Sequence, residues 1–296
     1  MTTQSWSGVL DHTSDAGFRA WGSDFSAKLA AIGLVQTSDT GQINWTTVTR
    51  PGANTAGGYE IWRINDSLHT ASPIFLKVEY GTGASAGAPN LWCTVGTGSN
   101  GSGTLTGSVT TRYATFSTAG TGNAATSYPS YFCAAEGFIG AVFRVGYTVS
   151  SVGLGFAVVR YSDDDGTPNG YGYTFHIYNG NAGVITTHTV QSVRTASPAT
   201  VFTANTSGRF ALWPSSVSGA SVDEAGNLQV VPFWTMTTRF QQEFAMCSYL
   251  NSEISQGTTF TFRLKGSTDR TFIALGNGFG VGAFAPSDAR CAMLWE

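Results

Sequence analysis

Apolar and polar residues alternate along much of the chain, and residues that favour turns separate the alternating segments. Alternation puts successive side chains on opposite faces of a strand, so it predicts strands that are buried on one face. In segment 74–80, for example, Leu76 and Val78 alternate with Lys77 and Glu79. The same reasoning predicts strands over 42–48, 59–64, 74–80, 91–95, 104–115, 137–149, 153–161, 171–178, 184–193, 209–213, 228–233, 258–265 and 271–275.

Helical spacing of apolar residues is visible in two segments. The first is a short helix that Ser23 or Asp24 would cap, with Leu29 on its apolar face and Gly33 at its end. We expect this helix to pack on the edge of a sheet. The second helix candidate, 237–254, has an imperfect apolar pattern.

Many short strands separated by turns, with few helices, are typical of an all-β sandwich or barrel. We therefore predict a large antiparallel β-sandwich, jelly-roll-like, with one short N-terminal helix and long loops rich in Gly, Thr and Ser. The sandwich would span residues 17–296 and follow an N-terminal arm over residues 1–16. A subdivision, if there is one, would fall near 117–128 or 163–170, where turn residues cluster.

Charged residues are scarce in this chain, so its surface is expected to be mostly uncharged. Of the 296 residues only 11% are charged, and the net charge is −3, whereas about a quarter of the residues are charged in an average protein. Ser, Thr, Asn and Gly must therefore cover the surface. Either this is a Thr-rich surface of the kind extracellular and virion proteins have, or much of it is an interface in an assembly. A weakly charged surface gives little repulsion between copies, so the chain should associate readily.

The same composition bears on partners and location. The arginines are spread singly, so we expect no nucleic-acid binding, and no apolar run is long enough for a transmembrane helix, so we expect no membrane insertion. The polar start of the chain does not read as a secretory signal. We expect a protein that works inside a cell or leaves it by assembly and lysis.

The four cysteines are Cys93, Cys133, Cys247 and Cys291. Their wide spacing contains no CxxC pair, which argues against a zinc site. Two disulfides could form in three ways, but without an export signal we expect buried thiols. The sequence leaves their oxidation state open.

Two glycine-rich segments match the letters of catalytic or cofactor-binding motifs. Segment 83–87 has the letters of a nucleophile elbow around Ser85, and 96–101 has the letters of a dinucleotide-binding loop. Both motifs need a helix directly after the loop, but Pro89 and strand-like residues follow the first, and small polar residues follow the second. We therefore expect no catalytic residue and no cofactor in either segment.

Metal ligands are sparse as well. Asp163, Asp164 and Asp165 could offer oxygens to calcium, but the rest of a calcium loop is missing, so a solvated turn is the better interpretation. His176 and His188 could face each other across a hairpin, but two histidines alone make a weak metal site. We expect no resident metal.

A glycan-cleaving enzyme would need two carboxylates that face a sugar. Glu60, Glu79 and Glu136 lie in apolar stretches, which makes them the carboxylates to locate in the fold. Nothing in the sequence pairs any two of them.

Trp6 and Trp295 lie near the two ends of the chain. Large terminal aromatics are candidates for docking into a neighbouring subunit, so both are possible assembly contacts. An equally well supported alternative is that each folds back on the core of its own chain.

Several blocks of the sequence resemble a recurring pattern in structural proteins of tailed bacteriophages. Residues 58–66 read GYEIWRIND and residues 75–81 read FLKVEYG. Further matching blocks lie at 39–45, 49–51, 226–233, Met246, 249–251 and 271–276.

The resemblance implies a virion protein of the tail, baseplate, neck or a fibre, without implying catalytic residues. Virion proteins of this kind lack export signals, are released by lysis and assemble with closed rotational symmetry. We therefore expect a virion component that is assembled in the host cytoplasm, with other virion proteins and copies of itself as partners.

The first functional hypothesis is thus a non-enzymatic structural component of a phage virion that acts by subunit packing and could also contact the host surface. The second is a carbohydrate-binding adhesin or receptor-binding module that uses exposed aromatic residues on a host glycan. The third is a glycan depolymerase with two carboxylates in a groove.

Overall fold

The structure of the protein is a computed structural model in which antiparallel sheets dominate. This confirms the predicted all-β fold class. It describes residues 2–83, 89–107, 109–110, 112–114, 127–146, 151–162, 168–179, 185–193, 230–236, 241–250, 254–263, 269–276 and 289–295.

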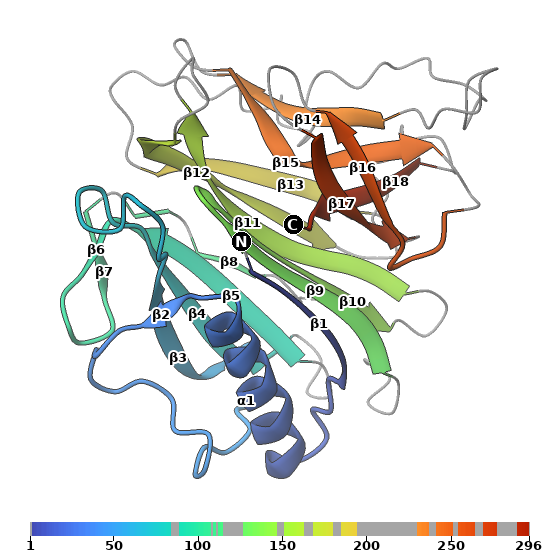
Figure 1. Cartoon of the computed structure of the whole chain (residues 1–296). Coiled ribbons are helices and arrows are strands. Elements are labelled where there is room, and N and C mark those ends of the chain that lie inside the picture. The colour runs from blue at the N-terminus through green and yellow to red at the C-terminus, as the bar shows by residue number, and fades with distance from the viewer. Residues whose placement is uncertain are drawn as a thin grey trace.

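Strands follow one another along the chain, apart from one helix near its start (Figure 1). In order, the described elements are β1 (Thr2–Val9), α1 (Asp15–Ala31), β2 (Val35–Gln36), β3 (Ala56–Arg63), β4 (Phe75–Thr82), β5 (Pro89–Gly96), β6 (Gly98–Ser99), β7 (Leu105–Thr106), β8 (Tyr113–Ala114), β9 (Ser127–Ala135), β10 (Phe138–Gly146), β11 (Ser151–Ser162), β12 (Pro168–Asn179), β13 (Ile185–Val193), β14 (Val230–Met236), β15 (Gln241–Leu250), β16 (Thr259–Arg263), β17 (Asp269–Gly276) and β18 (Ala289–Leu294).

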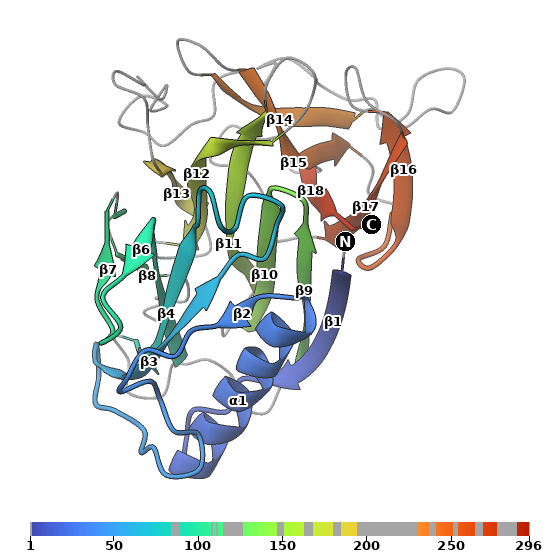
Figure 2. The same cartoon turned by 60° about the vertical axis from the view of Figure 1, so that its left-hand side comes forward.

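The strands form three main sheets. The central sheet has the order β1-β9-β10-β11-β12-β13, the N-terminal sheet β2-β3-β4-β5-β8, and the C-terminal sheet β14-β15-β18-β17-β16, while β6 and β7 make a small ribbon. The N-terminal and C-terminal sheets lie on opposite sides of the central sheet (Figures 1 and 2). The predicted sandwich therefore has a third layer.

Helix α1 lies between the N-terminal sheet and the central sheet. Its side chains Phe18, Trp21, Phe25 and Leu29 recur at helical spacing and are at most 1% exposed. The ring of Phe25 contacts Tyr80 of β4 on one side, at a centroid distance of 5.9 Å, and Phe132 of β9 on the other, at 5.2 Å. The helix is thus part of the core, and the predicted position on a sheet edge is wrong.

The other face of the central sheet receives the C-terminal sheet. A Cβ atom added to Gly140 of β10 would lie 2.7 Å from the sulfur of Met293 in β18, so the side chain of Met293 packs directly on the backbone of β10. Close by, the rings of Tyr131 and Trp295 meet edge to face at 5.7 Å. Alternation along β9 and β10 supplies apolar residues to both faces, as a middle layer requires.

The predicted start of the helix at Ser23 or Asp24 is wrong, whereas its predicted end is confirmed. The helix begins at Asp15, where the Oγ of Ser14 accepts a hydrogen bond from the backbone N–H of Gly17 at 3.0 Å. It ends before Gly33, whose φ of +97° suits a residue without a side chain.

Two other predicted elements are wrong. Segment 42–48 is irregular, with one turn over 45–47, rather than a strand, and the side chain of Asn44 accepts a hydrogen bond from the backbone of Thr46 at 2.9 Å. Segment 237–254 contains β15 instead of a helix, and β15 pairs with β14 on one side and β18 on the other. Pairing on both edges outweighs an imperfect helical pattern.

Most of the remaining predicted strands are confirmed within a few residues, but β1, β2, β6, β9 and β18 had no predicted counterpart. The residues predicted as an N-terminal arm, 1–16, contain β1 and the start of α1, and the predicted strand over 104–115 is divided into β7 and β8. The strand predicted over 209–213 lies outside the described residues.

Candidate functional site

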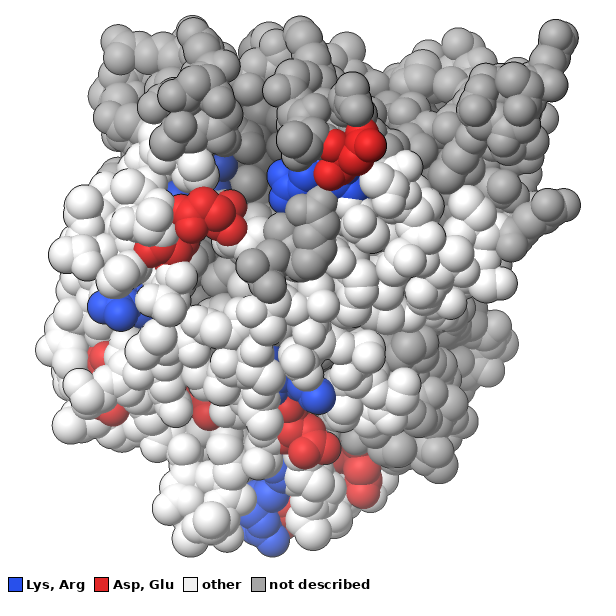
Figure 3. All heavy atoms as spheres, viewed as in Figure 1, with Lys and Arg blue, Asp and Glu red and all other residues white. Residues whose placement is uncertain are grey.

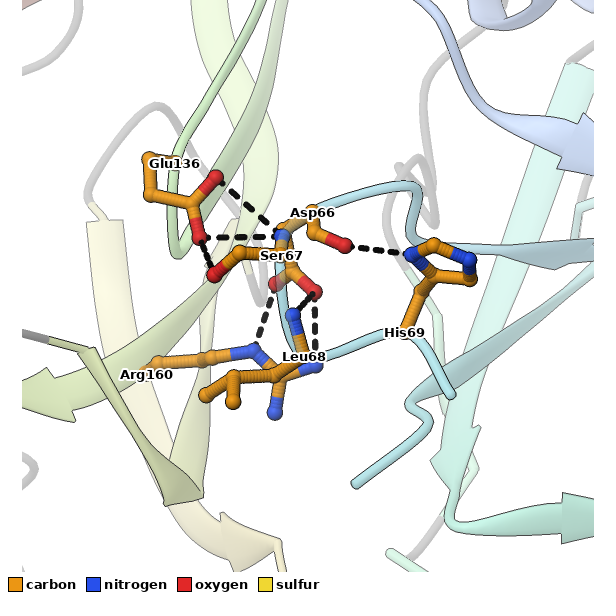
Figure 4. Close-up of polar contacts among 6 residues, drawn as sticks. All are labelled: Asp66, Ser67, Leu68, His69, Glu136 and Arg160. Carbon is orange, nitrogen blue, oxygen red and sulfur yellow. Dashed lines mark hydrogen bonds and ion pairs between the residues drawn. The ribbon is translucent and has the colours of Figure 1, made fainter. Parts of the chain in front are cut away.

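A buried ion pair joins two layers of the fold. Asp66 lies in the connection after β3, and Arg160 lies near the end of β11. The Nε of Arg160 donates to Oδ2 of Asp66 at 2.5 Å and Nη2 donates to Oδ1 at 3.0 Å (Figure 4). Both side chains are 1% exposed. The two-point contact is the geometry in which a guanidinium binds a carboxylate most strongly.

A second carboxylate, on the surface, binds the same connection between β3 and β4. Glu136, in the turn between β9 and β10, accepts hydrogen bonds from the backbone N–H of Ser67 at 3.0 Å and from its hydroxyl group (Figure 4). The backbone N–H of Arg160 donates to the carbonyl of Gly137 at 2.7 Å, which ties β11 to the same turn. We call Asp66, Ser67, Glu136 and Arg160 the interlayer clasp.

The clasp region also contains serine, histidine and aspartate, the residue types of a hydrolytic triad. A triad needs the serine hydroxyl to contact the histidine ring and the carboxylate to orient that ring. Here the hydroxyl of Ser67 binds Glu136 and the carboxylate of Asp66 binds Arg160. The Nδ1 of His69 instead meets the backbone carbonyl of Asp66 at 2.6 Å. This arrangement joins layers and does not assemble a nucleophile.

A second buried carboxylate lies between α1 and the N-terminal sheet. Glu60 is 1% exposed. Its Oε1 accepts hydrogen bonds from the hydroxyl of Ser26 at 2.7 Å and from the indole N–H of Trp45 at 3.0 Å, and its Oε2 accepts one from the hydroxyl of Tyr80 at 2.6 Å. Burial, together with the charge of Glu60, raises the pKa of Tyr80 well above its usual value, so this tyrosine remains a donor. The carboxylate thus links the helix, two strands and a loop.

Replacing Tyr80 by phenylalanine should destabilise the protein by about 2 kcal/mol, because it removes a donor to a buried carboxylate. Urea unfolding followed by tryptophan fluorescence measures the loss. Tyr59→Phe is the matched control, because that hydroxyl donates to a backbone carbonyl, of Thr40, in an exposed contact. Equal losses for the two variants would contradict the role given to Glu60.

His12 anchors the segment between β1 and α1 and is fully buried. Its Nε2 lies 2.6 Å from the hydroxyl oxygen of Thr82, and that hydroxyl donates to the carbonyl of Pro51 at 2.6 Å. Because the hydroxyl proton is already used, Nε2 must be the donor. Nδ1 is buried without a hydrogen-bond partner among the described residues, as suits a neutral ring that carries no proton there. Burial, with a contribution from the charge of Arg50, lowers the pKa of His12 from 6.5 to about 4.

Stability should therefore fall as the pH is lowered from 6.5 towards 4. The unfolded chain binds the His12 proton near pH 6.5, but the folded chain binds it only near pH 4, so acid favours unfolding over that interval. A shift of this size corresponds to at most about 3 kcal/mol, fully lost below pH 4. Urea unfolding at a series of pH values should show a weaker pH dependence in His12→Gln than in the unchanged protein. Identical profiles would contradict the assignment.

The two possible assembly contacts both touch their own chain. Trp6 of β1 is half-buried and packs against the core formed by α1, the N-terminal sheet and the central sheet. Trp295 is also half-buried, against Tyr131. These contacts match the alternative in which terminal tryptophans fold back on their own chain, while the assembly role stays a prediction.

The three carboxylates suggested for glycan cleavage lie in three different clusters. Glu60 is in the core and Glu136 is in the interlayer clasp. Glu79 lies on the outer face of the N-terminal sheet, where it pairs with Arg112 at 2.7 Å. The structure does not bring any two of them to one site.

The remaining motifs do not form a site in the described part of the structure. The glycine-rich segment 96–101 leads from β5 into β6 of the small ribbon, not into a helix. In the backbone register, His176 pairs with Thr189 and His188 pairs with Ile177, so the two histidines are not partners. Ser85 and the three aspartates Asp163, Asp164 and Asp165 lie outside the described residues.

Cys93 and Cys133 are buried thiols in two different sheets, as expected for cysteines that form no disulfide. The side chains of Cys247 and Cys291 lie outside the described part of the structure. Within the described residues, no group of three or more His, Cys, Asp or Glu side chains could hold a metal ion. The one helix in that part of the chain is too short and too polar to span a membrane.

Comparison with known proteins adds no family. No protein-family model matches this chain, and no curated protein matches it at a significant level.

Proposed function

We propose that this protein is a non-enzymatic structural component of a tailed-phage virion that acts by subunit packing in the tail, baseplate, neck or a fibre. The observation that carries the proposal is that each buried ionisable group described above joins two parts of the fold. Asp66 with Arg160 joins the connection after β3 to the central sheet, Glu60 joins α1 to the N-terminal sheet, and His12 holds the chain between β1 and α1. These groups stabilise a rigid stack of layers, which suits a building block.

The surface supports the same proposal. Figure 3 shows acidic and basic side chains in small groups, separated by wide uncharged areas of the described surface. With 11% charged residues and a net charge of −3, copies of the chain repel one another weakly. Such a surface favours packing against other subunits. The sequence blocks that resemble virion proteins are the reason for proposing a tailed-phage virion as the assembly.

The aromatic residues of the outer face of the N-terminal sheet do not favour the carbohydrate-binding alternative. A sugar would stack on an open aromatic ring, but the ring of Trp92 is covered by Arg112 at 4.3 Å and that of Tyr59 by Lys77 at 4.5 Å. Trp92 is only 7% exposed. These cation–π contacts stabilise the sheet face instead.

Fractionation of a phage lysate tests the proposal directly. Virions purified on a density gradient should contain the protein at a fixed ratio to the other virion proteins, as quantitative mass spectrometry measures it. Deleting the gene should yield particles that lack one substructure in electron micrographs. The proposal is wrong if complete, infectious particles form without the protein, or if it stays in the soluble fraction of the lysate.

A further inference from the structure

The first strand of the chain forms one edge of the central sheet. Eight consecutive residues of β1 pair with β9, from Thr2 opposite Ala134 to Val9 opposite Ser127, without a bulge. Among the described residues, no backbone hydrogen bond joins residues 2–6 to anything other than β9. In Figure 2, β1 is the outermost strand on its side of the sheet. Its outer edge therefore presents a row of backbone donors and acceptors.

This edge lacks the features that usually prevent edge strands from pairing. Natural edge strands are kept apart by short length, proline, bulges or charged side chains, lysine above all. Residues 2–9 read TTQSWSGV, which contains no proline and no charge. Both edges of the N-terminal sheet, by contrast, are strands of two residues, β2 and β8. The long edge of β1 stands out against these shortened edges.

We propose that β1 pairs with β1 of a second copy of this chain, antiparallel and across a two-fold axis, so that the two central sheets become continuous. An antiparallel strand edge is complementary to itself, because a two-fold axis places each donor opposite an acceptor of the other copy. No charge on either strand opposes the contact, and Ser5 is exposed near the middle of the strand, where the axis would pass. The proposed partner is therefore the chain itself.

Trp6 and Gly8 pack on each other along β1. The indole of Trp6 folds over Gly8 on its own strand, and a Cβ atom on Gly8 would lie 1.9 Å from that ring. Glycine thus lets Trp6 lie against the sheet. Trp6 is half-buried and would lie beside the new interface, consistent with its predicted part in assembly. The inference names the partner for the subunit packing proposed above and rests on that function only for its biological setting.

Charges introduced at Ser5 test the pairing. Sedimentation velocity over a range of concentrations should show a dimer of the unchanged protein. Ser5→Lys places like charges across the axis, which should weaken the dimer by about tenfold. Ser5→Glu should do the same, and an equimolar mixture of the two variants should recover the dimer. Ala27→Lys is the matched control, because it adds the same charge at an exposed position of α1.

Each remaining outcome overturns the inference. A protein that stays monomeric at every concentration has no such interface. An oligomer that Ser5→Lys leaves unchanged, or one larger than a dimer, uses another surface, including a head-to-tail contact with β13. Failure of the mixture to recover the dimer would mean that Ser5 does not face its counterpart. None of these results bears on whether virions contain the protein, so the two proposals can fail separately.

Discussion

Replacing Asp66 by asparagine is expected to lower the free energy of unfolding by about 3 to 5 kcal/mol, because it leaves the charge of Arg160 buried without its counter-ion. The side chain of Arg160 is 1% exposed, and its Nη1 already has no hydrogen-bond partner among the described residues. Asp66 is therefore the group that compensates this charge. The variant keeps nearly the same shape, so lost packing contributes little to the effect.

Urea unfolding at neutral pH measures the loss, and an exposed ion pair provides the control. Glu79 and Arg112 also meet at 2.7 Å, but their side chains are 18% and 43% exposed. Glu79→Gln should therefore cost less than about 1 kcal/mol. If Asp66→Asn and Glu79→Gln cost the same, the interlayer clasp does not stabilise the fold as described.

A double variant separates the cost of an unpaired charge from the net contribution of the pair. Replacing Asp66 by leucine and Arg160 by methionine removes both charges and retains much of the side-chain volume. Buried ion pairs replaced in this way often lose little stability. We expect Asp66→Leu with Arg160→Met to be more stable than Asp66→Asn. A double variant less stable than the single one would show that the pair itself, and not the avoidance of an unpaired charge, stabilises the layers.

Local patterns in the sequence predicted the strands, because strand alternation depends on neighbouring residues only. The segments around Val78 and Trp92 became β4 and β5 as expected. The start of α1 was missed because Gly17 and Gly22 disfavour a helix locally. In the fold, a Cβ on Gly17 would meet the carboxylate of Asp11 at 2.5 Å, and one on Gly22 would meet the ring of Trp45 at 2.1 Å. Contacts with distant residues, which no local pattern records, explain both glycines.

The buried charges were only partly predictable. Arg160 follows Phe156 and Val158 at strand spacing, so alternation places it on a buried face, where it must have a partner. Its partner, Asp66, is 94 residues away in the chain, and nothing in the sequence connects the two. Glu60 shares its strand face with Trp62 in the same way, but its three donors come from α1, a loop and β4. Alternation thus identifies a charged residue that will be buried, but only the fold identifies its partners.

Replacing Phe25 by alanine is expected to cost about 3 to 5 kcal/mol, because this one side chain fills the space between α1 and two sheets. Phe25 is fully buried, and its ring contacts Tyr80 of the N-terminal sheet and Phe132 of the central sheet. Alanine leaves a cavity that both sheets border. The central sheet is also held by the C-terminal sheet and the interlayer clasp, so it cannot move freely to close this space.

Urea unfolding of three variants separates this cavity effect from a change in helix propensity. Ala27→Gly weakens the same helix at an exposed position and should cost about 1 kcal/mol. Phe25→Leu keeps most of the buried volume and should cost clearly less than Phe25→Ala. If Phe25→Ala cost no more than Ala27→Gly, α1 would not be part of the core. The expected order, with Phe25→Ala far the most destabilising, would instead show that the helix joins the two layers.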